Sequence, residues 1–185
     1  MAPREAELSA ARRWSLALVA TATMAVSYVD RQTFAVLAPT VTKELGLTGG
    51  EYGTLVASFS VTYMIFPPLA GRLLDRVGVR LGLLAAVLTW SAVAGGHALA
   101  VGFSSLLALR LLLGAAEAPS FPGAAATVAR ALPVADRGAG FGLLFTGSSI
   151  GAMIAPPLAT WLAHHWGWRA RSRAAARSWR RWSCR

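Results

Sequence analysis

Long apolar stretches alternate with short polar segments along most of this chain. A helix that crosses a bilayer needs roughly 20 consecutive and mostly apolar residues. Several stretches reach about this length, and charged residues gather in the short segments that separate them. The pattern therefore predicts an all-α membrane protein with about five transmembrane helices, at residues 14–38, 52–70, 81–101, 105–131 and 139–163.

Arginines occur in every second connection between these stretches. They lie in residues 1–13, between the second and third stretches, and between the fourth and fifth. The other connections carry lysine and glutamate, or no charge at all. Cytoplasmic loops of membrane proteins carry an excess of Lys and Arg. We therefore expect residues 1–13 to form a cytoplasmic N-terminus and the arginine-bearing loops to lie on the same side of the membrane.

The composition excludes an ordinary soluble domain. Hydrophobic residues make up 55% of the chain and charged residues only 14%, whereas soluble domains have about 25% charged residues. The net charge of +10 would suit a nucleic-acid-binding protein, but seven of the 18 basic residues lie in residues 169–185. The rest of the chain is close to neutral and offers no folded basic surface, so no nucleic-acid partner is expected.

The chain changes character after Trp168. Residues 169–185 are rich in arginine and contain no leucine, isoleucine or valine, although a sixth apolar stretch should begin here. One interpretation is a frameshift near Arg169, which would leave a disordered tail on a fragment that ends before its sixth helix. The alternative is a genuine basic tail that binds anionic lipid headgroups, with each arginine contributing roughly 1 kcal/mol.

Four ionisable residues lie within the apolar stretches: Asp30, Arg31, Arg110 and Glu117. A charge at the centre of a membrane helix costs roughly 2.5–3.5 kcal/mol on insertion scales, and such residues usually belong to ion or substrate pathways. Arg110 and Glu117 are about two helical turns apart and so share a face. We expect opposite charges to pair between the first and fourth stretches, either as a transport site or as fixed ion pairs that hold the helices together.

Such a pairing can couple a proton to an anion. If a substrate anion captures an arginine, the carboxylate that was its partner becomes easier to protonate. No arrangement of residues indicates catalysis, so we do not expect an enzyme. The single Cys184 and the lack of ligand clusters predict no metal site and no cofactor.

Four segments resemble known transporters. The charged loop at residues 71–80 resembles the signature loop between the second and third helices of the major facilitator superfamily. The segments at 28–31 and 110–122 resemble the anion:cation symporter family within it, which takes up sugar acids and other organic anions with protons or other cations. Residues 147–157 are similar to the bacterial hexuronate transporters of that family.

The resemblance implies the N-terminal half of a twelve-helix fold in a bacterial inner membrane. It implies a proton and an organic anion such as a hexuronate as transported partners, with a C-terminal half missing from this chain. It implies proton-coupling roles for Asp30 and Glu117. The substrate-binding residues that it implies are Arg31, Arg110, Tyr63 and, less directly, Tyr28. The residues expected to form a conformation-setting loop are Gly71, Asp75, Arg76, Gly78 and Arg80.

Two other functions remain open at this point. The chain could be a membrane fragment that does not transport, and a complementary second half encoded nearby would argue against that. It could also belong to an exporter of another substrate class, such as cationic or lipophilic compounds. Because a site for cations would not need buried arginines, Arg31 and Arg110 favour an anion.

Overall fold

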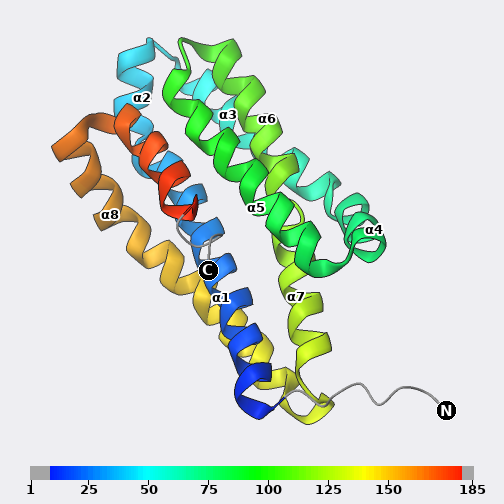
Figure 1. Cartoon of the computed structure of the whole chain (residues 1–185). Helices are drawn as coiled ribbons and strands as arrows, with labels where there is room; N and C mark the ends of the chain where they lie inside the picture. The colour runs from blue at the N-terminus through cyan, green and yellow to red at the C-terminus, as the bar shows by residue number, and fades with distance from the viewer. Residues whose placement is uncertain (1–8, 181–185) are drawn as a thin grey trace.

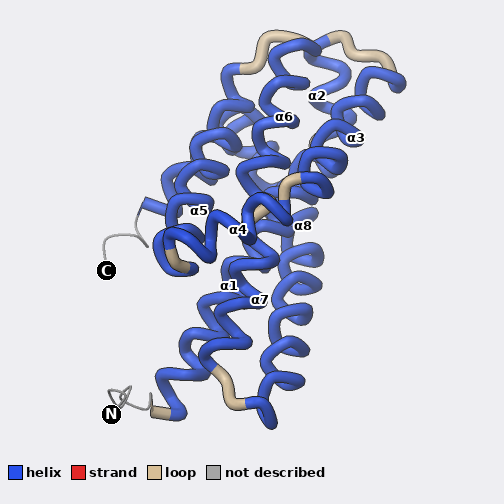
Figure 2. The backbone as a smooth tube through the Cα atoms, turned by 90° about the vertical axis from the view of Figure 1, so that its right-hand side faces the viewer, coloured by secondary structure: helices blue, strands red, loops and turns tan. Residues whose placement is uncertain are grey.

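The computed structural model describes residues 9–180, and within that range it contains helices and short connections but no strand. Figures 1 and 2 show the helices packed as an elongated bundle, most of them running along its long axis. The predicted all-α fold is therefore confirmed. Residues 1–8 and 181–185, which include the end of the predicted arginine-rich tail, lie outside the described residues.

The first predicted stretch forms two helices, α1 (Ala10–Val36) and α2 (Ala38–Leu45). The Ser9 side chain accepts a hydrogen bond from the backbone of the first turn of α1, as an N-cap residue should. A proline in the first turn of α2 cannot continue α1 without a break. The chain leaves α2 at Gly46, whose φ of 63° is the left-handed conformation that glycine adopts easily.

The second stretch is bent. Helices α3 (Gly49–Ile65) and α4 (Pro67–Val77) meet at 47°, immediately before two consecutive prolines. Gly78, with a φ of 86°, then links α4 to α5 (Val79–Gly96), which is followed by the short helix η1 (His97–Leu99). Gly78, the second glycine of the predicted signature loop, thus makes the tight turn between α4 and α5.

The fourth stretch is also broken. It forms α6 (Phe103–Glu117) and α7 (Ser120–Ala131), and Ala118 and Pro119 lie between them. After η2 (Val134–Asp136), the last helix, α8 (Arg137–Arg180), runs beside α1 over much of its length (Figures 1 and 2). The backbone of residues 169–180 continues α8, and both origins suggested for the tail stay predictions.

Two helical segments are long and apolar enough to cross a membrane by themselves, Val79–Leu99 and Val134–His165. The bent pair α3 and α4 makes a third if it counts as one span. The first and fourth predicted stretches do not qualify, because charged residues interrupt the apolar character of α1 and a break divides α6 from α7. The expected count of five spans therefore stays a prediction.

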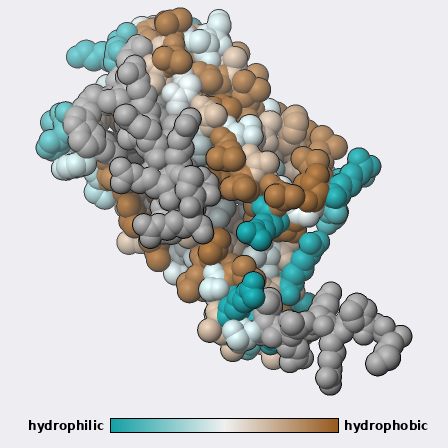
Figure 3. Space-filling view, viewed as in Figure 1, coloured by the Kyte–Doolittle hydropathy of each residue, from teal (hydrophilic) through white to brown (hydrophobic). Residues whose placement is uncertain are grey.

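Large apolar side chains cover much of the surface. Met64 and Met153 are 72% and 75% exposed, and Leu81 is 65% exposed. Figure 3 shows apolar residues across the visible face, with hydrophilic residues mainly at its margins. Exposed apolar area of this extent indicates a surface that contacts lipid or other helices rather than water.

Glycines bring two pairs of helices into close contact. A Cβ atom on Gly147 of α8 would lie 2.7 Å from the carbonyl oxygen of Thr21 in α1, and one on Gly151 would overlap the carbonyl of Ala25. On α6, a Cβ on Gly114 would lie 2.5 Å from the carbonyl oxygen of Phe59 in α3. The absence of a side chain at these positions lets the backbones touch, as small residues do in membrane helix pairs.

Candidate anion-binding site

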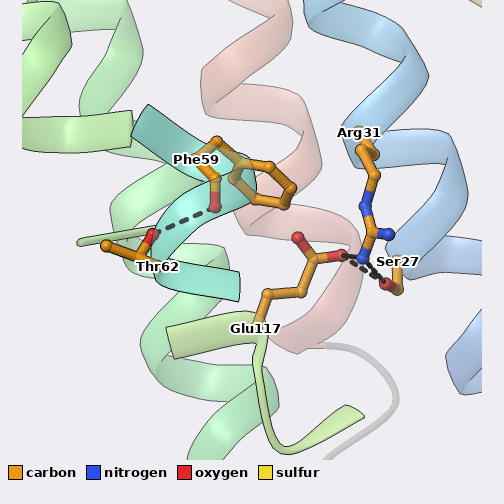
Figure 4. A network of polar contacts seen from close by, with 5 residues as sticks. All are labelled: Ser27, Arg31, Phe59, Thr62 and Glu117. Carbon is orange, nitrogen blue, oxygen red and sulfur yellow. Dashed lines mark hydrogen bonds and ion pairs between the residues drawn. The ribbon is translucent and has the colours of Figure 1, made fainter. Parts of the chain in front are cut away.

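A buried ion pair joins the first and fourth predicted stretches. Nη2 of Arg31, in α1, lies 3.2 Å from Oε1 of Glu117, the last residue of α6 (Figure 4). The side chain of Glu117 is 1% exposed and that of Arg31 is 22% exposed. The predicted pairing of opposite charges across these helices therefore occurs, and Arg31 is its more accessible member.

Ser27 is a third member of this cluster. It lies one helical turn before Arg31 on the same face of α1, and it is fully buried. Its hydroxyl group donates a hydrogen bond to Oε1 of Glu117 and accepts one of 3.3 Å from Nη2 of Arg31. Sequence reasoning did not single out Ser27 as a site residue, although its spacing of four from Arg31 could have pointed to it.

The second carboxylate oxygen of Glu117 is free. Oε2 is buried and has no hydrogen-bond partner among the described residues. A buried oxygen that lacks a partner carries a desolvation penalty. This atom is therefore available to bind a proton, whereas Oε1 is already held by Ser27 and Arg31.

The position of Glu117 depends on the contact between α6 and α3. Gly114 lies one turn before Glu117 and faces the backbone carbonyl of Phe59 and the side chain of Thr62. Figure 4 shows Phe59 and Thr62 on one side of the Glu117 carboxylate and Ser27 with Arg31 on the other. The close approach at Gly114 thus places Glu117 between α1 and α3.

Three aromatic rings surround the Arg31 guanidinium. Its central carbon lies 4.1 Å from the centroid of the Tyr63 ring, 5.0 Å from that of Tyr28 and 5.2 Å from that of Phe59. A guanidinium within about 6 Å of such a ring is attracted by the ring face. The structure therefore brings both sequence-predicted tyrosines to Arg31 and adds Phe59, which the sequence analysis did not identify.

Arg110 occupies a neighbouring position on α6. Its guanidinium carbon lies 4.2 Å from the centroid of Phe34 and 4.7 Å from that of Phe59, and its Nε donates to the backbone oxygen of Leu55 at 3.4 Å. Arg110 is only 3% exposed. Within the described residues no carboxylate lies at ion-pair distance from it; a carbonyl dipole and ring faces are its near contacts, and Glu117 attracts its charge from farther away.

A cavity of about 300 Å³ lies beside both arginines. This volume is at the lower end of the range for ligand pockets, roughly 300–1,000 Å³. Residues of α1 and α3 form most of its wall, and Arg110 of α6 completes it. The lining residues are Arg31, Gln32, Phe34, Ala35, Tyr52, Val56, Phe59, Ser60, Tyr63 and Arg110.

Other predicted residues lie away from this cavity. Asp30 and Tyr28 are not among its lining residues, although both are close to Arg31 in sequence. Of the predicted loop residues, Asp75 lies with Gly71 and Arg76 on α4, and Arg80 lies in the first turn of α5. Asp75 forms an exposed ion pair, 3.4 Å long, with Arg130 of α7. This pair links the loop to α7, and the conformation-setting charge network expected there stays a prediction.

The described residues contain no cluster of three or more His, Cys, Asp or Glu side chains that could hold a metal ion. Two guanidinium groups line the cavity, with aromatic rings against both of them, and the buried carboxylate of Glu117 is paired with Arg31 outside the lining.

Comparison with known families gives a match over most of the chain. Residues 20–170 match the family described as the Major Facilitator Superfamily. The chain is 35% identical over 156 residues to the hexuronate transporter of Escherichia coli strain K12, a match that covers 83% of this chain and 36% of that protein. It is 33% identical over 156 residues to the galacturonate transporter of Dickeya chrysanthemi, a match that covers 83% of this chain and 45% of that protein. The chain therefore spans less than half the length of these relatives.

Solved structures show the same fold. A bacterial homolog of the human lysosomal transporter Spinster, in an inward-facing and occupied conformation, is similar with a TM-score of 0.76 at 23% identity. The match covers 82% of this chain and 33% of that one. The inward-facing and unoccupied form of a bacterial Spinster homolog gives a TM-score of 0.77 at 20% identity. This match covers 90% of this chain and 40% of that one.

Proposed function

Because the chain belongs to the Major Facilitator Superfamily, we propose that it carries the anion-binding and proton-binding groups of a sugar-acid transporter. The substrate is a hexuronate or a related sugar acid, taken up with a proton across a bacterial inner membrane by alternating access. The N-terminus is on the cytoplasmic side. The names of the relatives from Escherichia coli and Dickeya chrysanthemi support this substrate class.

The observation that carries the proposal is the pair of arginines at one cavity. Arg31 and Arg110 both line it, and both guanidinium groups lie within 5.2 Å of the centroid of the Phe59 ring. Guanidinium groups bind carboxylates through two parallel hydrogen bonds. A cavity with two such groups, and with Glu117 outside its lining, favours a small anion over a cation or a neutral molecule.

Glu117 supplies the coupling in this proposal. In the absence of substrate its Oε1 is paired with Arg31. When a substrate carboxylate binds Arg31, the carboxylate of Glu117 loses this partner and takes a proton from water on its free Oε2. The substrate anion and the proton then enter together, and because their charges are opposite the pair adds no net charge to the buried site.

Asp30 is proposed as a second proton-binding group, on the basis of its charge within α1 and of the family resemblance. Tyr63 is proposed to contact the substrate, since its ring lies against Arg31 at the cavity. Tyr28 packs on Arg31 from outside the cavity lining, so we propose that it orients the guanidinium.

Binding of a radiolabelled sugar acid tests this function directly. We expect the purified chain in lipid nanodiscs to bind D-[14C]galacturonate, and we expect Arg31→Ala to weaken the binding by at least about 10-fold, since a charge-assisted pair contributes roughly 1.5–3 kcal/mol. Arg130→Ala is the matched control, because it removes an exposed arginine far from the cavity lining. Unchanged affinity of the Arg31→Ala variant would contradict the proposed role.

A further inference from the structure

The cavity contains uncharged polar side chains as well as arginines. Gln32, Tyr52 and Ser60 line it together with Arg31 and Arg110. We propose that these three residues, called here the neutral wall, bind hydroxyl groups of the anion and select polyhydroxylated carboxylates over carboxylates of similar size without hydroxyls. The inference rests on the proposed function, because it assigns a second part of the same ligand.

The neutral wall lies on the faces of α1 and α3 that meet at the cavity. On α3, Tyr52 and Ser60 of the wall are eight residues apart, and Tyr63, which also lines the cavity, follows three residues later, so all three lie on one helical face. On α1, Gln32 follows Arg31 directly. A carboxylate held by Arg31 therefore has uncharged hydrogen-bonding groups beside it on both helices.

Gln32 has unused hydrogen-bonding capacity. Its side-chain amide offers two donors and one acceptor, and it makes no hydrogen bond or ion pair with another group in the described part of the chain. The side chain is partly buried, so it is neither a fully solvated surface amide nor a satisfied core residue. It is placed to bind a ligand hydroxyl group either as donor or as acceptor.

The two residues of α3 supply further groups. The Ser60 hydroxyl donates to the backbone oxygen of Val56 at 3.1 Å, which leaves its oxygen free to accept. The Tyr52 ring is stacked on Phe34 with the centroids 5.6 Å apart, and Phe34 in turn lies under Arg110. This stack holds the Tyr52 ring in place at the cavity, and its phenol can both donate and accept.

Selection by hydroxyl groups follows from the cost of leaving these side chains unpaired. A site that hydrogen-bonds a ligand hydroxyl discriminates against an analogue that lacks it, because a polar group covered by the analogue loses water and gains no partner. Ser60 is exposed and Gln32 and Tyr52 are partly buried, so each contributes a modest part of this discrimination. The arginines alone would bind any small carboxylate. The neutral wall is the part of the cavity that can distinguish a sugar acid from a carboxylate of the same size without hydroxyl groups.

Competition binding to the purified chain in nanodiscs tests this inference. We expect D-galacturonate to bind more tightly than cyclohexanecarboxylate, which has a six-membered ring and one carboxylate but no hydroxyl. Gln32→Leu and Ser60→Ala should each weaken galacturonate binding by roughly two- to tenfold, as expected for one hydrogen bond. Neither should weaken cyclohexanecarboxylate binding. Thr89→Val, which removes an exposed hydroxyl from α5 outside the cavity lining, should change neither affinity.

The outcomes separate this inference from the proposed function. If galacturonate binding depends on Arg31 while both neutral-wall variants keep the wild-type preference, the inference is wrong and the function stands. An equal loss for the two ligands in both variants would also overturn it, since it would indicate a distorted cavity. If the wild-type chain binds neither acid, or if Arg31→Ala binds both as tightly as the wild type, the proposed function fails as well. Circular dichroism of each variant checks that the helices are retained.

Discussion

Replacement of Gly151 by alanine should loosen the contact between α1 and α8. The added Cβ atom would overlap the backbone carbonyl of Ala25. A backbone carbonyl inside a helix cannot rotate away as a flexible side chain can, so the two helices must move apart. Overpacking of this kind lowers the free energy of unfolding by about 1–3 kcal/mol. The contact that weakens is the one between α8 and α1, the helix that contains Arg31.

Gly142→Ala is the matched control on the same helix. Gly142 is exposed, and a Cβ placed on it would have no atom within 4 Å. Both substitutions gain helix propensity, which amounts to about 1 kcal/mol for a change from glycine to alanine. The difference between the two variants therefore isolates the contact with α1. We expect Gly151→Ala to be less stable than Gly142→Ala by about 1–3 kcal/mol.

Unfolding in mixed micelles with increasing sodium dodecyl sulfate, followed by circular dichroism, measures this difference in the free energy of unfolding. The reasoning is refuted if Gly151→Ala is as stable as Gly142→Ala or more stable, because the backbones of α1 and α8 would then not be in contact at this position. Gly147→Ala should behave like Gly151→Ala, since its Cβ would lie 2.7 Å from the carbonyl oxygen of Thr21.

Two further predictions concern the buried cluster. Ser27→Ala removes the hydroxyl that donates to Oε1 of Glu117 and should lower the free energy of unfolding by about 1.5–3 kcal/mol. The same detergent titration measures this loss, with Ser15→Ala at an exposed position as control, and equal stability of the two variants would show that the hydrogen bond contributes little. Glu117→Gln should lower the proton uptake that accompanies galacturonate binding, as measured with a pH-sensitive dye in weakly buffered solution, and any remaining uptake is assigned to Asp30. Proton uptake equal to that of the wild type would remove Glu117 from the coupling role.

The pattern of the sequence indicated the all-α fold and the kinds of group at the candidate site, but not the breaks that divide three of the five stretches into two helices. Runs of apolar residues predict helices because each residue contributes locally to the preference for lipid over water. The prolines at 67–68 and 119 coincide with the breaks after α3 and α6, since proline restricts its own backbone wherever it occurs. Charges within apolar stretches indicated Asp30, Arg31, Arg110 and Glu117 because burial of a charge is costly in any fold, and three of these four belong to the ion pair or the cavity lining.

Only the tertiary structure decided which groups meet. Asp30 and Arg31 are adjacent in sequence, yet successive residues of a helix point in different directions, and it is Arg31 that faces Glu117. Arg110 shares a helix with Glu117, but it contacts Phe34, Phe59 and the Leu55 carbonyl of other helices.

The place of Gln32 in the cavity lining was likewise not predictable from local pattern, because glutamine occurs on every kind of helix surface. For Ser27, the spacing of four from Arg31 was the only local signal. Periodicity determines which residues share the face of one helix. The rotation of α1, α3 and α6 relative to one another depends on contacts between distant residues, such as Gly114 against Phe59 and Gly151 against Ala25. Those contacts, rather than the order of residues along the chain, bring two arginines to the cavity and place the carboxylate of Glu117 beside one of them.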